Sequence, residues 1–76
     1  MKEKFFNILK DINPDILDSK SDSLVDDGII DSLNVMQIVT AFEKEFSISI
    51  DFDDIDPDNF QSVESLWALL TKYSNK

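Results

Sequence analysis

Residues 28–46 read GIIDSLNVMQIVTAFEKEF, and they place a turn directly before a long amphipathic helix. Gly28 suits a turn that needs a positive φ, because glycine has no Cβ to clash in that conformation. From Ser32 onward the apolar side chains recur at the three- and four-residue spacing of a helix, which predicts a helix over 32–46 with one core-facing side. The residues of that side are Val35, Ile38, Val39, Phe42 and Phe46.

Two further amphipathic helices are predicted, one on each side of this segment. The first covers 1–12 and ends before Asn13-Pro14, because proline seldom continues a helix. The last starts at Ser62, a favourable N-cap residue, with Glu64 in the first turn. The core positions are Phe5, Ile8, Leu9 and Ile12 in the first helix and Val63, Leu66, Trp67, Leu70 and Tyr73 in the last.

The connections between these helices are unequal in length. Residues 13–31 predict a long first loop, with a short turn of helix near Pro14 and four apolar residues that pin the loop to the bundle. Residues 47–50 alternate like a strand, but no second strand exists to pair with them, so we expect an extended connector. Residues 51–59 predict a loop, or a loop with a short third helix. The fold class is therefore all-α: a small bundle of three main helices, a short third helix and a long first loop.

Composition limits the chemistry that the chain can perform. Its 76 residues suit one domain, over 1–76. The chain has no cysteine and no histidine, which excludes disulfides, zinc fingers, a cysteine nucleophile and a Ser-His-Asp triad. A chain this short also has little room to surround a substrate, so we do not expect an enzyme.

The charge is strongly negative, with 7 basic and 16 acidic residues and a net charge of −9. Such a surface repels nucleic acid and anionic lipid, whereas it attracts basic protein surfaces. No apolar run approaches a membrane span, and the first residues do not form a secretory signal. We expect a cytoplasmic monomer that neither binds nucleic acid nor inserts into membranes.

Opposite the apolar side of the central helix lie Leu33, Met36 and Thr40. Two large apolar side chains are thus predicted to face solvent near the start of this helix. Exposed apolar patches often mark binding surfaces, although isolated surface hydrophobes are also common. Ser32 by itself is consistent with a simple helix N-cap.

Asp31-Ser32-Leu33, with Gly28 and two isoleucines just upstream, resembles the attachment motif of the acyl carrier and peptidyl carrier family. The end of the central helix and its exit, over 42–48, and the segment 56–63 are also similar to that family. The resemblance covers essentially the whole chain. The tripeptide is common by chance, so its weight comes from its setting in a small acidic domain with a long first loop.

The resemblance implies a covalent cofactor, 4'-phosphopantetheine from coenzyme A, joined to the Ser32 hydroxyl by a phosphopantetheinyl transferase, with Asp31 and Leu33 flanking the attachment site. The thiol of this arm would hold acyl or aminoacyl cargo as a thioester. The chain would then be a carrier and a substrate of acyl- or aminoacyl-activating and acyl-transferring enzymes with basic docking surfaces. The side chains expected to meet these partners are Leu33, Met36, Thr40 and Glu43.

Several cargoes and two other functions stay open. Asn34 and Gln37 stand where fatty-acid carriers of the family commonly have acidic residues, so a polyketide, nonribosomal peptide or D-alanyl pathway is as consistent as fatty acid biosynthesis. An acidic helical binding module would use Ser32 only as a cap. A calcium sensor starting at Asp54 lacks the glycine and glutamate of an EF-hand loop, at Asn59 and Ser65, so no dedicated metal site is expected.

Overall fold

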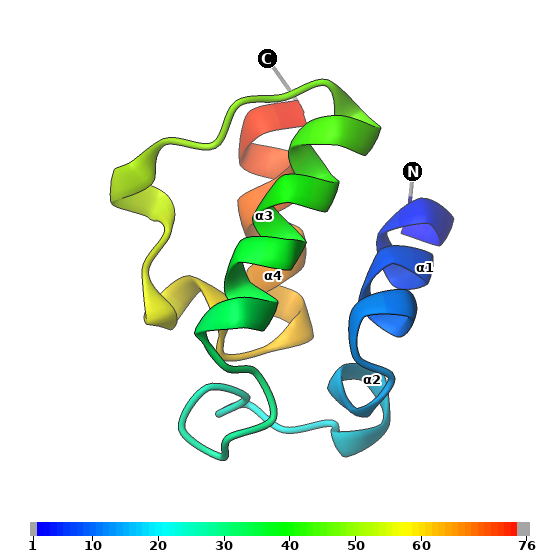
Figure 1. Ribbon diagram of the computed structural model, residues 1–76, viewed down its shortest axis with the longest axis vertical. Helices are drawn as coiled ribbons and strands as arrows, with labels where there is room; N and C mark the ends of the chain where they lie inside the picture. Colours follow the sequence, from blue (N-terminus) through cyan, green and yellow to red (C-terminus); the bar gives the residue numbers. More distant parts are fainter. Residues whose placement is uncertain (1, 75–76) are drawn as a thin grey trace.

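The computed structural model describes residues 2–74, and every regular element within that range is helical (Figure 1). This confirms the predicted all-α fold class. The elements are α1 (Lys2–Ile12), α2 (Asp15–Ser19), α3 (Ser32–Phe46), η1 (Phe52–Asp54), η2 (Pro57–Phe60) and α4 (Val63–Ser74), where η denotes a 3₁₀ helix. The predicted start of the first helix, Met1, lies outside the described residues.

Three long helices, α1, α3 and α4, form the body of the bundle (Figure 1). The short α2 continues from the end of α1, and the long first loop then passes beneath the first turn of α3. The segment containing η1 and η2 lies on the side of α3 away from α1 and leads into α4. The start of α3 is therefore surrounded by the first loop and by the η1–η2 segment.

The core is wholly apolar within the described part of the chain, because no polar or charged residue there is buried. Phe5 joins the three long helices: its ring centroid lies 5.7 Å from that of Phe42 and 5.1 Å from that of Trp67. Burial of apolar side chains is thus the main stabilising contribution, at about 25 cal/mol for each Å² removed from water. The core residues are Phe5, Leu9, Ile16, Leu24, Ile30, Ile38, Val39, Phe42, Ile50, Phe60, Leu66, Leu69 and Leu70.

The segment between α1 and α3 is held at three points by buried side chains, those of Ile16 in α2 and of Leu24 and Ile30 in the loop that follows. Leu24 also donates its backbone N–H to the carbonyl of Gln61 at 2.7 Å, which fixes the loop to the start of α4. Gly28 has a φ of 77°, which confirms the positive φ predicted for this turn. The loop therefore has a defined path to the start of α3, although it contains no long helix.

The predicted short third helix is a pair of 3₁₀ turns, η1 and η2. Asp51 and Asp56 cap them, accepting hydrogen bonds from the backbone N–H groups of Asp53 at 3.1 Å and Asp58 at 2.9 Å. Pro57 cannot donate a backbone hydrogen bond, and aspartates satisfy backbone groups in turns, so two tight turns form instead of one continuous helix. Before them, Ser47 has a left-handed backbone with a φ of 53°, so the predicted extended connector does not begin at this residue. Residues 48–50 form no regular secondary structure, and Ile50 is buried, one of the two isoleucines expected to point inward.

The last helix begins with a reciprocal pair of serines. The Ser65 N–H donates to the Ser62 hydroxyl at 3.0 Å, and the Ser62 N–H donates to the Ser65 hydroxyl at 3.1 Å. This is the arrangement of a capping box and confirms Ser62 as the N-cap. Of the helices within residues 2–74, none has the length and hydrophobicity required to cross a bilayer.

Candidate functional site

The central helix α3 is capped by Asp31, not by Ser32. Asp31 has an extended backbone, and its carboxylate accepts a hydrogen bond from the Asn34 N–H at 2.8 Å. The interpretation of Ser32 as the N-cap is therefore wrong. Ser32 is instead the first residue of α3, where its exposed hydroxyl is not needed to cap the helix. An acceptor one residue earlier fills the capping position, which leaves the serine available for chemistry.

A chain of side-chain amides steadies the approach to this helix. Asn13, between α1 and α2, donates to the carbonyl of Ile29 at 2.8 Å and to the Asn34 side chain at 3.4 Å. Asn34 in turn donates to Gln37 at 3.0 Å. The two amides that stand in place of acidic family residues therefore bond to each other near Ser32, and the first turn of α3 carries no carboxylate.

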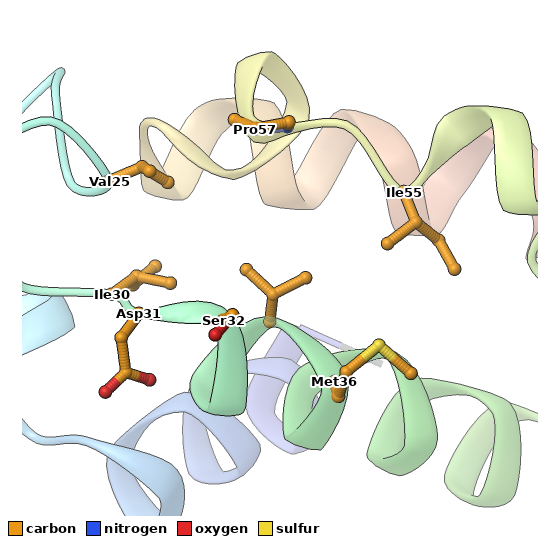
Figure 2. A pocket seen from close by; sticks show the side chains of 8 residues that line it. Val25, Ile30, Asp31, Ser32, Met36, Ile55 and Pro57 are labelled. Atoms are coloured by element: carbon orange, nitrogen blue, oxygen red, sulfur yellow. The ribbon is translucent and has the colours of Figure 1, made fainter.

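An apolar cavity of about 320 Å³ opens beside Ser32 (Figure 2). Its walls come from the first loop, from α3 and from the η1–η2 segment. In Figure 2, Ile55 and Pro57 lie across the cavity from α3, while the Asp31 carboxylate points away from it. The lining residues are Val25, Ile30, Asp31, Ser32, Val35, Met36, Ile55 and Pro57. Such a cavity, with one hydroxyl at its edge, is suited to an apolar chain.

The predicted partner surface on α3 is present but not uniform. Leu33 is 66% exposed and Met36 is 52% exposed, and Thr40 is exposed on the same helix. Glu43 differs from these three, because its carboxylate accepts a hydrogen bond from the Ile50 N–H at 2.9 Å. Glu43 therefore holds the connector after α3, in addition to any charge it presents to a partner.

Two features of this region were missed in the sequence. Phe52 is 82% exposed at the start of η1, and its acidic neighbours in the sequence could have indicated a solvent-facing position. The cavity residues Val25, Ile55 and Pro57 come from segments that only the folded chain brings together, so no local pattern reveals them. Within residues 2–74, no group of three or more acidic side chains is placed to hold a metal ion.

Comparison with known proteins places these observations in a family. The family described as "Phosphopantetheine attachment site" matches residues 4–70, which include Ser32 and all but the last turn of α4. The chain is also 40% identical over 50 residues to a protein named acyl carrier protein from Buchnera aphidicola subsp. Baizongia pistaciae (strain Bp). That alignment covers 66% of this chain and 62% of the relative. No solved structure matches the chain significantly.

Proposed function

The chain belongs to the phosphopantetheine-attachment family of acyl and peptidyl carrier proteins, and we propose that it carries acyl or aminoacyl cargo as a thioester on 4'-phosphopantetheine bound to Ser32. The observation that carries this proposal is the position of Ser32. Its hydroxyl is exposed on the first residue of α3, it is not needed as the helix cap, and it stands at the edge of an apolar cavity.

The surroundings of Ser32 fit a phosphodiester. The first turn of α3 contains no carboxylate, and the N-terminus of a 15-residue helix favours an anion. Asp31 is the nearest acidic residue in the sequence, but its carboxylate is bonded to the Asn34 N–H and is directed away from the cavity. The bound group supplies a thiol on a long arm, which this chain, lacking cysteine, cannot provide itself.

Attachment would make Ser32 the substrate of a phosphopantetheinyl transferase. The serine oxygen forms a bond to the phosphorus that carries the pantetheine arm in coenzyme A. The bond from that phosphorus to the nucleotide half breaks, and the serine proton passes to a base of the transferase. Ser32 thus needs exposure and not an activating histidine, which is consistent with the composition.

The apolar cavity favours one class of cargo over the other. An arm attached at its edge can fold back so that an apolar acyl chain lies against Val35 and Ile55, where burial stabilises it in proportion to the apolar area covered. A small polar cargo such as an aminoacyl group would gain little from that contact. An apolar acyl cargo is therefore favoured, and D-alanyl or peptidyl cargo is the alternative.

Partners would meet the chain at the face of α3 beside the arm. Leu33, Met36 and Thr40 are exposed there, and the net charge of −9 attracts basic enzyme surfaces. Weak, fast contacts of this kind suit a carrier that must leave each enzyme it visits. We propose that residues 1–76 form one carrier domain that serves the transferase and the acyl- or aminoacyl-transferring enzymes.

The test is the intact mass after incubation with coenzyme A and a promiscuous phosphopantetheinyl transferase. The wild type and Ser49→Ala, a control at another exposed serine, should each gain one phosphopantetheine unit, whereas Ser32→Ala should gain none. If the folded wild type gains nothing while a known carrier is modified in parallel, the proposal fails. An acidic binding module without a cofactor would then be the leading explanation.

A further inference from the structure

We propose that Asp54 and Tyr73 form a clamp that holds Ile55 and Pro57 in the cavity wall, and that this clamp determines how well apolar cargo is shielded from water. The part that concerns cargo rests on the proposed attachment of the arm to Ser32. The clamp itself rests only on contacts within the chain.

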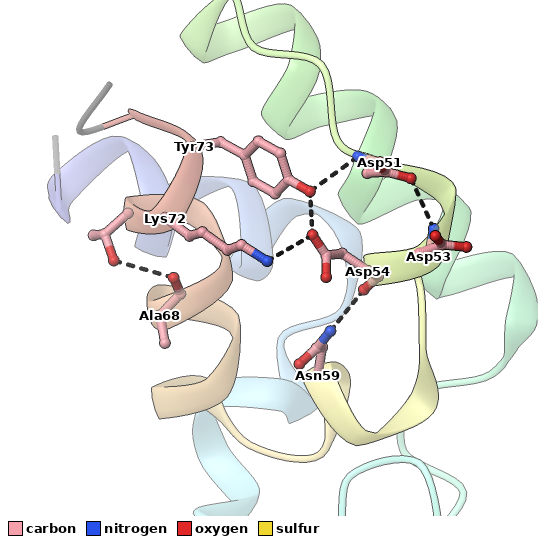
Figure 3. Close-up of polar contacts among 8 residues, drawn as sticks. Asp51, Asp53, Asp54, Asn59, Ala68, Lys72 and Tyr73 are labelled. Carbon is pink, nitrogen blue, oxygen red and sulfur yellow. Dashed lines mark hydrogen bonds and ion pairs between the residues drawn. The ribbon is translucent and has the colours of Figure 1, made fainter.

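The clamp joins the last turn of α4 to η1 (Figure 3). The Tyr73 hydroxyl donates to the Asp54 carboxylate and accepts the backbone N–H of Asp51 at 3.1 Å. Lys72 adds an ion pair with the same carboxylate at 2.9 Å. The Tyr73 side chain therefore contacts both Asp51, which caps η1, and Asp54, the last residue of η1.

Fixing Asp54 also fixes the cavity wall, because Ile55 follows it directly in the chain. The Asp54 carbonyl accepts a hydrogen bond from the Asn59 side chain at 2.7 Å, so this residue is tied to α4 through its carboxylate and to η2 through its backbone. In the sequence, Ile55 and Pro57 lie between Asp54 and Asn59, the two residues that this hydrogen bond joins. Movement of Asp54 away from α4 would require the contacts of its carboxylate with Tyr73 and Lys72 to break.

Burial alone does not hold η1 in place. No residue of η1 is buried, and its one large apolar side chain, Phe52, is 82% exposed. The first fully buried residue after it is Phe60, at the end of η2. The polar contacts of Asp54 therefore supplement the apolar contacts on either side of η1, which come from the buried Ile50 and the partly buried Ile55.

Within the clamp, Tyr73 is expected to matter more than Lys72. The side chain of Lys72 is 59% exposed, whereas that of Asp54 is 23% exposed. Ion pairs with one highly exposed partner contribute little, because water and salt screen them. The tyrosine, by contrast, is partly buried and makes two hydrogen bonds to η1.

The first test measures hydrogen exchange in the chain without an arm. Tyr73→Phe removes only the hydroxyl and with it both hydrogen bonds to Asp51 and Asp54. It should speed exchange of the amides in η1 and at Ile55 by at least about five-fold, the effect of losing a single ordinary hydrogen bond. Thr71→Ala is the matched control, because the Thr71 hydroxyl donates to the Ala68 carbonyl within α4. Equal exchange in Tyr73→Phe and the wild type would overturn the clamp.

The second test measures thioester hydrolysis after the arm is loaded with octanoyl or acetyl cargo. Tyr73→Phe should hydrolyse the octanoyl thioester several-fold faster than the wild type while leaving the acetyl thioester unchanged, because only the longer chain reaches the cavity. Asp54→Asn, which keeps the shape but weakens the acceptor, should act in the same direction. A general loss of folding would instead affect both cargoes alike.

The outcomes separate the two parts of the proposal. Faster exchange with unchanged octanoyl hydrolysis would overturn the role of the clamp in shielding cargo. Failure of the arm to attach would contradict the proposed function of Ser32, but exchange in the unmodified chain would still decide whether the clamp exists.

Discussion

Asp31 brings two separate properties to the start of α3, a hydrogen-bond acceptor and a negative charge. The structure shows the use of the acceptor, which caps the helix at the Asn34 N–H. The charge is free to act on a basic enzyme surface, because Asp31 is exposed. These two roles can be separated by substitution, since asparagine caps helices about as well as aspartate.

We predict that Asp31→Ala lowers the free energy of unfolding by about 1 kcal/mol, whereas Asp31→Asn changes it by only a few tenths. Urea unfolding measures this difference. The rate of arm attachment should fall in both variants if the transferase recognises the charge, and only in Asp31→Ala if it requires an ordered helix start. An Asp31→Ala variant as stable as the wild type would contradict the capping role.

Tyr73 is the only tyrosine in the chain, so its titration can be followed by phenolate absorbance. The hydrogen bond to Asp54 raises the pKa of Tyr73 above its ordinary value of 10.0, and the same carboxylate raises the pKa of Lys72. Both groups hold their protons more tightly in the folded chain. Their contribution to stability is therefore complete below about pH 10 and is lost as the pH rises through the raised pKa values.

We accordingly predict a phenolate midpoint above pH 10.0 in the wild type, and a lower midpoint in Asp54→Asn, where the charged acceptor is gone. The alkaline loss of stability should be smaller in Tyr73→Phe. A wild-type midpoint at or below that of the unfolded chain in denaturant would show that the contact with Asp54 does not form in solution.

At the scale of elements, the sequence predicts the long helices more accurately than the 3₁₀ turns and the cavity that lie beside them. The apolar spacing in 32–46 indicates a helix whose observed bounds are Ser32–Phe46, because a long periodic stripe has one stable arrangement against a core. The two 3₁₀ turns depend on aspartate caps and on Pro57, which act over two or three residues without a period. The cavity joins three separate segments, so only tertiary packing creates it.

The first loop provides a prediction at this scale. The Gln61 side chain accepts the backbone N–H groups of Val25 at 3.1 Å and of Asp26 at 3.4 Å, and it thereby holds one edge of the cavity to the start of α4. Gln61→Ala should lower the free energy of unfolding by about 1 kcal/mol and speed exchange at these two amides. Gln61→Glu keeps an acceptor oxygen and should preserve most of their protection. If both variants exchange alike, the side-chain bond is not what orders the loop.

At the scale of the whole molecule, the apolar core and the charge act against each other. A chain of 76 residues with a net charge of −9 has a small core, and the described part of it buries no charged residue, so the charges of residues 2–74 are carried at the surface. Like charges at the surface repel and lower the stability of the compact state. The same negative charge attracts basic partners. A mutation that removes negative charge and so reduces the repulsion should therefore also slow the encounter with these partners.

Salt should therefore stabilise this chain. At 0.1 M the screening length is about 10 Å, which is short enough to weaken repulsion across the surface. A gain of about 1 kcal/mol would raise the Tm by about 4–8 °C for a domain of this size. Because screening acts on the surface charge as a whole, Mg²⁺ and Ca²⁺ at equal concentration should raise the Tm alike and without saturating at stoichiometric amounts. Thermal unfolding in NaCl, MgCl₂ and CaCl₂ measures this. A response to micromolar Ca²⁺ that Mg²⁺ does not reproduce would instead indicate a dedicated site and would revive the calcium-sensor hypothesis.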